Sequence, residues 1–168
     1  KRPHRRNSTI QKYQEVFDAY YQYYKKHFMD YTKPFDGIRE SLDYAKKKGV
    51  LLFIYTNKPQ AIATEVINHS FKPGTFEKVI GIPLGGKTKP DAKAFFDQTR
   101  EYGLDFTKGC YFGDSDTDIL TAKNLGITNM YSVCWGYKTY EFLSNYPIHP
   151  KKILKDPHEI MKVVDNQI

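Results

Sequence analysis

The feature that most constrains the fold is an alternation, from Val50 onward, of short apolar runs with segments of helical length. The run Val50–Tyr55 is almost continuously apolar, as expected of a strand that is covered on both faces. Four further strands are predicted, at Lys78–Ile80, Gly109–Phe112, Asn129–Val133 and Ile153–Leu154. Strands that alternate with helices are typical of a parallel sheet with helices on both faces. The pattern therefore predicts a doubly wound α/β fold.

Helices are predicted between these strands and before the first of them. Ile10–Tyr31 has apolar residues at helical spacing and contains neither Gly nor Pro. The other predicted helices span Ile38–Lys48, Pro59–His69, Asp91–Tyr102, Thr117–Leu125 and Thr139–Asn145, with a last helix after Asp156 and Pro157. No repeat or low-complexity linker interrupts this order.

Composition excludes several classes of protein. The chain has 168 residues, of which 40% are hydrophobic and 15% aromatic, so we expect one packed domain with a small appendage. No apolar run approaches the roughly 20 residues that cross a bilayer. No hydrophobic segment follows the basic first residues, so no signal peptide is predicted. Cys110 and Cys134 lack metal-ligand spacing, and we expect them to be reduced, buried thiols of a cytoplasmic protein.

The formal net charge of +7 raises the question of a nucleic-acid partner. Apart from the basic cluster at the start, the lysines are scattered among acidic residues. We therefore predict neither a nucleic-acid nor a membrane partner. A basic protein also suits a small anionic substrate.

Residues that carry chemistry follow three of the predicted strands, at the carboxyl ends where such sheets bind ligands. Thr56 and Asn57 follow the first strand, and Lys87 and Lys89 lie in a glycine-rich turn after the second. Three carboxylates follow the strand Gly109–Phe112, those of Asp114, Asp116 and Asp118. Carboxylates suit Mg²⁺, whereas lysine and backbone N–H groups neutralise phosphoryl oxygens. Together these residues predict a site for a phosphate ester and a hard cation.

Each element alone has an ordinary structural interpretation. Thr56 and Asn57 could form a simple turn, and the glycine-rich stretch lacks P-loop spacing. The acidic run is not an EF-hand, because Ile119 and Leu125 stand where that loop requires Gly and Glu. The combination at three successive strand ends is much more specific than any single part.

The combination resembles the haloacid-dehalogenase-type phosphatases. The matching segments are Tyr55–Pro59 for their second motif, Lys87–Asp91 for their third and Gly113–Asp118 for their fourth. Trp135-Gly136-Tyr137 is similar to the phosphoglycolate phosphatases in particular, and Phe28–Gly49, which contains Lys33–Ile38, resembles the exit from their helical cap into the core. The resemblance implies part of a cap over residues 1–34 and a core over residues 35–168.

The resemblance also implies roles for individual residues. Thr56 would donate a hydrogen bond to a phosphoryl oxygen, together with the backbone N–H of Asn57. Lys87 would offset negative charge on the nucleophile and the phosphate. Asp114 would bind Mg²⁺, and Asp118 would orient the lysine or a metal-bound water. Asp116 is expected to be peripheral.

Lys89 is the alternative to Lys87. The family motif is usually Lys-Pro-x-Pro-Asp, and Thr88 stands at the first proline. Counting back four residues from Asp91 favours Lys87.

The family's first motif, an apolar strand ending in Asp-x-Asp-Gly-Thr, has no match before Val50. Asp114-Ser115-Asp116 follows an apolar strand but lacks the Gly-Thr. We expect the nucleophilic aspartate to lie outside these residues and the 168-residue chain alone to be inactive. In the sheet, the strands Val50–Tyr55 and Gly109–Phe112 should then flank an empty position, with Lys78–Ile80 and Asn129–Val133 outside them.

The function implied for the intact protein is Mg²⁺-dependent hydrolysis of a small phosphoester such as 2-phosphoglycolate through an aspartyl-phosphate intermediate. One alternative is a non-catalytic relative that binds phosphate or a partner. A phosphoacceptor receiver domain is a further alternative, but there the acidic cluster precedes the Thr and Lys, whereas here it follows them.

Overall fold

The computed structural model describes residues 5–82, 86–147 and 150–167, which form two compact units. The described part of the first unit, Lys1–Lys33, consists of helix α1 (Arg5–His27) and the turn after it. The predicted helix is confirmed, although it begins five residues earlier and ends four earlier than expected. None of the described helices has the length and apolarity needed to span a membrane.

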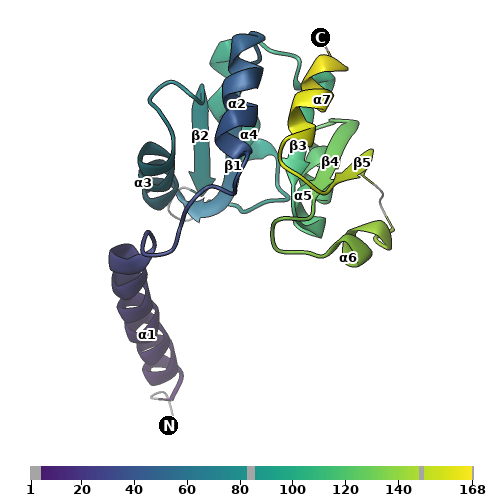
Figure 1. The fold of residues 1–168 in the computed structure, drawn as a ribbon. Coiled ribbons are helices and arrows are strands. Elements are labelled where there is room, and N and C mark those ends of the chain that lie inside the picture. The colour runs from purple at the N-terminus through teal and green to yellow at the C-terminus, as the bar shows by residue number, and fades with distance from the viewer. Residues whose placement is uncertain (1–4, 83–85, 148–149, 168) are drawn as a thin grey trace. The chain divides into compact units, whose positions relative to one another are not determined.

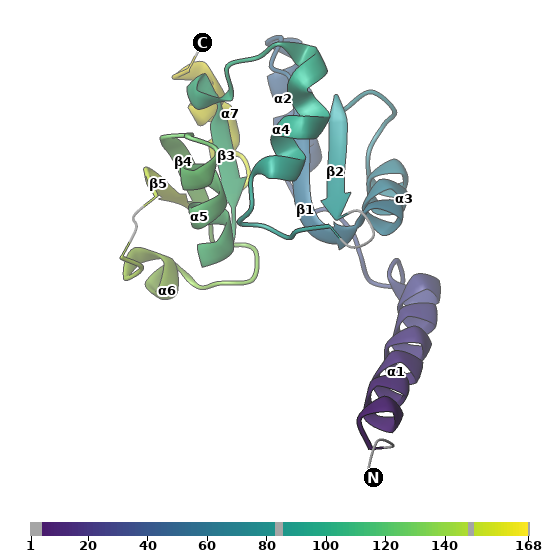
Figure 2. The same ribbon diagram turned by 180° about the vertical axis from the view of Figure 1, so that it is seen from behind.

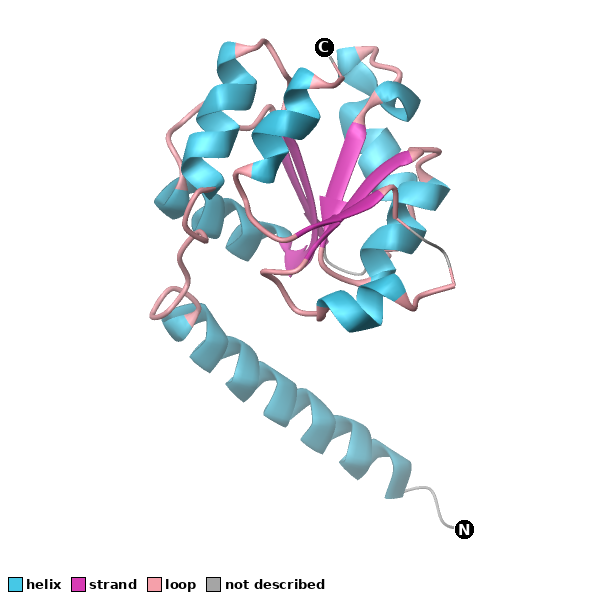
Figure 3. Ribbon diagram, turned by 45° about the vertical axis from the view of Figure 1, so that its right-hand side comes forward, coloured by secondary structure: helices cyan, strands magenta, loops and turns pink. Residues whose placement is uncertain are grey.

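The second unit, Pro34–Ile168, contains all the described strands. Their bounds are Phe53–Pro59 for β1, Lys78–Ile82 for β2, Cys110–Gly113 for β3, Asn129–Val133 for β4 and Lys152–Leu154 for β5. Strands β1 and β2 form one sheet and β3, β4 and β5 another, and every pair is parallel (Figures 1 and 3). The predicted parallel α/β fold is confirmed.

Helices cover both faces of these sheets. Their bounds are Ile38–Lys47 for α2, Gln60–Ser70 for α3, Lys93–Thr99 for α4, Asp116–Asn124 for α5, Tyr140–Ser144 for α6 and Glu159–Asp165 for α7. Two short 3-10 helices span Arg100–Tyr102 and Phe106–Lys108. Helices α2 and α7 lie on one face (Figure 1), whereas α4 and α5 lie on the opposite face (Figure 2).

Each face has its own apolar core. On the α4 and α5 face, Phe95 and Ile119 pack with Ile80 and Met130 of the strands. The core on the α2 and α7 face contains Ala45, Tyr131, Val133, Leu154, Ile160, Val163 and Val164. Strands that are covered on both faces need apolar side chains on both, which is why their sequences are continuously apolar.

Strand β1 differs from the prediction at both ends. It begins at Phe53, three residues after Val50, and continues to Pro59. Its pairing with β2 is irregular after Tyr55, so Thr56–Lys58 lie in a bulge and not in a strand-to-helix turn. Gly81 allows this close approach, because a Cβ there would lie 2.8 Å from the carbonyl oxygen of Lys58.

The paired strands have the predicted neighbours, and β5 lies beyond β4. Within the described residues, no backbone ladder joins β1 to β3, so each of these strands is paired on one side only. This arrangement agrees with the expected unfilled position between them.

Cys110 and Cys134 both carry free thiols, as predicted. Both are only partly buried, so the expectation that they are buried is wrong. Burial raises the pKa of both thiols, which keeps them protonated near neutral pH.

Candidate active site

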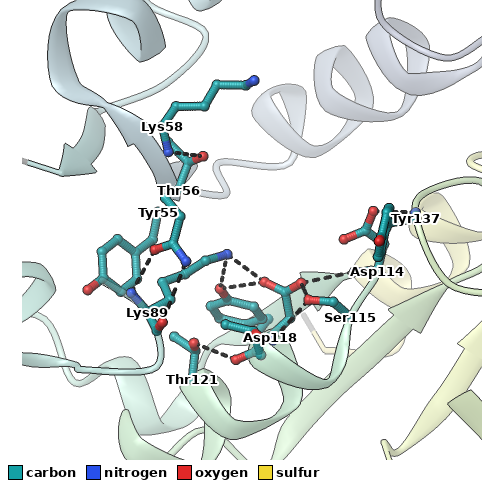
Figure 4. A network of polar contacts seen from close by, with 12 residues as sticks. Tyr55, Thr56, Lys58, Lys89, Asp114, Ser115, Asp118, Thr121 and Tyr137 are labelled. Carbon is teal, nitrogen blue, oxygen red and sulfur yellow. Dashed lines mark hydrogen bonds and ion pairs between the residues drawn. The ribbon is translucent and has the colours of Figure 1, made fainter. Parts of the chain in front are cut away.

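The candidate site lies at the carboxyl ends of β1 and β3, where segments far apart in the sequence meet (Figure 4). The bulge of β1 supplies Thr56 and Asn57, and the loop after β2 supplies Lys89. The end of β3 and the first turn of α5 supply Asp114 and Asp118. Ligands of open parallel sheets bind at this edge.

An ion pair between Lys89 and Asp118 forms the centre of the site. The Nζ of Lys89 lies 2.6 Å from Oδ1 of Asp118, and these side chains are only 12% and 7% exposed. A charge that is this well buried is stable only when it is paired and hydrogen-bonded. The pair therefore fixes both the position and the charge of the lysine.

The carboxylate of Asp118 accepts several further hydrogen bonds. Its Oδ2 accepts from the Ser115 hydroxyl at 2.6 Å and from the Asp114 backbone N–H at 3.2 Å. Burial alone would raise the pKa of Asp118, but the charge of Lys89 and the hydrogen bonds from Lys89, Ser115 and Tyr111 outweigh it and hold that pKa below its usual value. The carboxylate is therefore ionised at neutral pH.

Tyr111, on β3, connects the two partners of the ion pair. Its hydroxyl donates to Asp118 Oδ1 at 3.2 Å and lies 3.4 Å from Lys89 Nζ. Burial, reinforced by the negative charge of Asp118, raises the pKa of the Tyr111 phenol well above its usual value. Tyr111 is therefore a neutral donor to the carboxylate.

Asn57 fixes the backbone of Lys89. Its Oδ1 accepts from the Lys89 backbone N–H at 2.7 Å, and its Nδ2 lies 3.5 Å from the Lys89 carbonyl oxygen. This link joins the bulge of β1 to the loop after β2. The side chain of Asn57 thus has a structural contact that the sequence did not predict.

Lys87 was expected to be the lysine of the site, and the structure places it elsewhere. Its Nζ lies 3.3 Å from Asp91, and its side chain is 78% exposed. Of these two lysines, only Lys89 contacts Asp118. The contact with the buried carboxylate is therefore made by Lys89, the alternative that the sequence analysis kept open.

Thr56 lies in the bulge of β1, where its Oγ1 accepts a hydrogen bond from the Lys58 backbone N–H at 3.2 Å. In Figure 4 it points away from the ion pair of Lys89 and Asp118. The structure thus brings Thr56 to the same edge of the fold without placing it in the polar network.

Asp114 follows β3 directly and lies beside the loop after β4. Its Oδ2 accepts a hydrogen bond from the Tyr137 backbone N–H at 2.6 Å, and its carbonyl oxygen accepts one from the Lys138 backbone N–H at 3.2 Å. Within the described part of the chain, no hydrogen bond reaches Asp114 Oδ1. Asp116 lies in the first turn of α5, and among the described residues no hydrogen bond or ion pair joins its side chain to Asp118.

These residues fit a cation that needs few protein ligands. The described residues contain no cluster of three or more His, Cys, Asp or Glu side chains. Mg²⁺ commonly takes one or two carboxylates and completes its shell with phosphate oxygens and water. The carboxylate of Asp114 suits that kind of coordination, and Asp118 is already occupied by Lys89.

Sequence reasoning missed three contributors to the site, namely Tyr111, Ser115 and Tyr137. The role of Ser115 had a signal, because Ser115 and Asp118 have the Ser-x-x-Asp spacing of a helix-capping pair. Tyr137 lies in the segment Trp135-Gly136-Tyr137 that the family resemblance singled out without giving it a role. Tyr111 had no signal, since its contacts depend on tertiary packing.

Several known proteins are similar to this chain. The model of the family described as "Haloacid dehalogenase-like hydrolase" matches residues 3–131. A phosphoglycolate phosphatase of Aquifex aeolicus is 28% identical over 155 residues, which cover 90% of this chain and 70% of that protein. A phosphoglycolate phosphatase of Caulobacter vibrioides is 32% identical over 114 residues, covering 68% of this chain and 48% of that protein.

A solved structure of similar fold is the "putative phosphoglycolate phosphatase" of Lactobacillus delbrueckii. It aligns with a TM-score of 0.82 and 27% identity over 92% of this chain. The alignment covers 63% of that protein, so this chain spans roughly half to two thirds of the length of these relatives.

Proposed function

The chain belongs to the haloacid dehalogenase-like hydrolase family, and on that premise we propose that the intact protein is a Mg²⁺-dependent phosphatase acting on a small phosphoester. The observation that carries the proposal is the buried pair of Lys89 and Asp118 beside Asp114. A substrate such as 2-phosphoglycolate is supported by the relatives, several of which are phosphoglycolate phosphatases.

In this proposal Lys89 takes the role that the sequence analysis gave to Lys87. Its ammonium group offsets the negative charge on the phosphoryl oxygens and the nucleophile. Asp118 is a positioning residue, because it holds the ammonium group through the 2.6 Å contact. The Thr56 hydroxyl and the Asn57 backbone N–H donate to a phosphoryl oxygen.

Asp114 is the proposed ligand of Mg²⁺. When bound, the cation neutralises charge on the phosphoryl group. The protein's own contribution is a carboxylate next to Asp118, to which the Asp114 backbone N–H is hydrogen-bonded. Asp116, which was expected to be peripheral, has no role in the proposal.

The nucleophile is the aspartate of the family's first motif, which no segment of these 168 residues matches. In the proposed reaction its carboxylate oxygen bonds to phosphorus while the bond from phosphorus to the ester oxygen breaks, and the departing alcohol takes up a proton. Water then attacks phosphorus, releasing inorganic phosphate and the free aspartate. The strand that carries this motif would pair with the unpaired sides of β1 and β3.

We further propose that residues 1–34 belong to a helical cap and residues 35–168 to the catalytic core. A cap would cover a small substrate and exclude water from it. A cytoplasmic location is also part of the proposal, since both cysteines carry free thiols.

The test is release of inorganic phosphate by the intact protein from 2-phosphoglycolate and a panel of other small phosphoesters. We expect turnover with Mg²⁺ and none after the metal is chelated. Asp114→Asn should lower kcat by about 100-fold or more, as loss of a group that stabilises the transition state does. The matched control is Asp116→Asn, two residues away. Metal-independent turnover, or equal activity of both variants, would contradict the proposal.

A further inference from the structure

The segment Trp135-Gly136-Tyr137, which follows β4, has no role in the function proposed so far. Two of its residues contact Asp114, and the third anchors the segment to the core. Trp135 packs against the apolar core on the α2 and α7 face, which anchors the segment. Gly136 touches the Asp114 side chain, and the Tyr137 backbone N–H donates to Asp114 Oδ2 at 2.6 Å.

The approach at Gly136 is too close for any other residue. A Cβ at this position would lie 2.1 Å from Oδ2, 2.4 Å from Cβ and 2.6 Å from Cγ of Asp114. Rotating the Asp114 side chain does not relieve the overlap, because its Cβ is fixed by the backbone. A larger residue at position 136 must therefore displace either the loop or Asp114 itself.

The hydrogen bond from Tyr137 distinguishes the two carboxylate oxygens of Asp114. Oδ2 accepts the Tyr137 backbone N–H, whereas within the described residues Oδ1 accepts no hydrogen bond. Groups that hydrogen-bond a ligating carboxylate orient it towards the metal and contribute to affinity. The loop after β4 is therefore suited to orienting Asp114 with one oxygen available.

We propose that Trp135–Tyr137 is a positioning device for the metal ligand, in which Gly136 makes the space and the Tyr137 N–H holds Oδ2 so that Oδ1 faces a divalent cation. The inference rests on the proposed function, because it takes Asp114 to be the ligand. It adds residues that follow β4 to the candidate site. In this proposal Gly136 is a positioning residue that contacts neither the substrate nor the cation.

The experiment measures the dissociation constant of Mn²⁺, which shares the preference of Mg²⁺ for oxygen ligands, from the intact protein by electron paramagnetic resonance. Gly136→Ala should weaken Mn²⁺ binding by about 10- to 100-fold, the usual effect of losing an outer-shell partner. The matched control is Gly109→Ala, directly before β3, where an added Cβ would meet nothing closer than 3.2 Å. That variant should bind Mn²⁺ within about twofold of the unsubstituted protein.

Asp114→Asn separates failure of this inference from failure of the proposed function. If Asp114→Asn loses Mn²⁺ affinity and Gly136→Ala does not, the positioning role is wrong and the proposed ligand stands. If neither variant loses Mn²⁺ affinity, both the positioning role of Gly136 and the assignment of Asp114 as the metal ligand are wrong. Should Gly136→Ala fail to fold, a crystal structure of the unsubstituted protein with Mn²⁺ decides. The metal on Asp114 Oδ1 with the Tyr137 contact intact supports the inference, and a carboxylate turned away from Tyr137 overturns it.

Discussion

Lys89 and Asp118, which are 29 residues apart in the sequence, form a contact of 2.6 Å between Nζ and Oδ1 in a largely buried setting. The contact joins the loop after β2 to the first turn of α5. The two strands that precede these segments belong to different sheets. The ion pair therefore connects segments that follow strands of the two different sheets at the candidate site.

Asp118→Asn should destabilise the fold at neutral pH. The substitution leaves the Lys89 ammonium group buried without its counter-charge, which typically costs about 3–5 kcal/mol. Denaturant unfolding at pH 7 measures this loss. Asp116→Asn is the matched control and should change the free energy of unfolding by less than about 0.5 kcal/mol.

The same comparison should depend on pH. Because the pKa of Asp118 is lower in the folded state than in the unfolded state, its contribution is fully present above the unfolded value of about 3.9. The contribution is lost as the pH falls through the folded-state pKa. The stability difference between the unsubstituted protein and Asp118→Asn should therefore shrink below about pH 4. A difference that stays constant down to pH 2 would contradict the assigned shift.

Tyr111→Phe removes a hydroxyl that donates to Asp118 and leaves the ring in place. We expect a loss of about 1 kcal/mol in the free energy of unfolding, the usual net value of one hydrogen bond. Because the pKa of Tyr111 is raised, its phenolate should contribute nothing to the ultraviolet absorbance until well above the usual tyrosine value of about 10. If the ultraviolet absorbance of the unsubstituted protein and of Tyr111→Phe differs on titration near pH ~10, Tyr111 ionises normally and the raised pKa is wrong.

The 168-residue chain alone should not release phosphate from 2-phosphoglycolate, since no segment of it matches the motif that carries the nucleophile. A lysine and a metal ligand neutralise charge, but they cannot form the phosphorylated intermediate. The assay compares the purified chain with the intact protein at the same Mg²⁺ concentration. Sustained Mg²⁺-dependent turnover by the chain alone would mean that the nucleophile is among its residues.

The fold could be predicted from the sequence because hydrophobic periodicity and the Gly and Pro residues that end helices and strands are local signals. The strand at Asn129–Val133 was predicted to the residue, and the helix of the Gly113–Asp118 region to within one. Two elements differ more. The helix predicted over Asp91–Tyr102 is α-helical only over Lys93–Thr99, with a 3-10 turn after it, and β1 continues through Thr56–Lys58 as a bulge. That bulge depends on the close approach of Gly81 in the neighbouring strand, which no local pattern reveals.

The candidate site was predictable in its location but not in its contacts. Strand ends of a parallel sheet converge, so Asp114 and Asp118 were found from topology. Which lysine contacts Asp118 depends on the path of the loop after β2, which Asn57 fixes from another strand. Counting residues back from Asp91 could not supply that, although the Lys-Pro dipeptide at Lys89 was a usable signal.

The most direct test of the central claim compares two lysines that are two residues apart. Lys89→Met and Lys87→Met remove the same charge and keep similar volume, but only Lys89 contacts Asp118. In the intact protein with 2-phosphoglycolate and Mg²⁺, Lys89→Met should lower kcat by about 10²- to 10³-fold. Lys87→Met should stay within about twofold of the unsubstituted protein. Equal activity of the two variants, or a larger loss for Lys87→Met, would contradict the assignment of Lys89 to the active site.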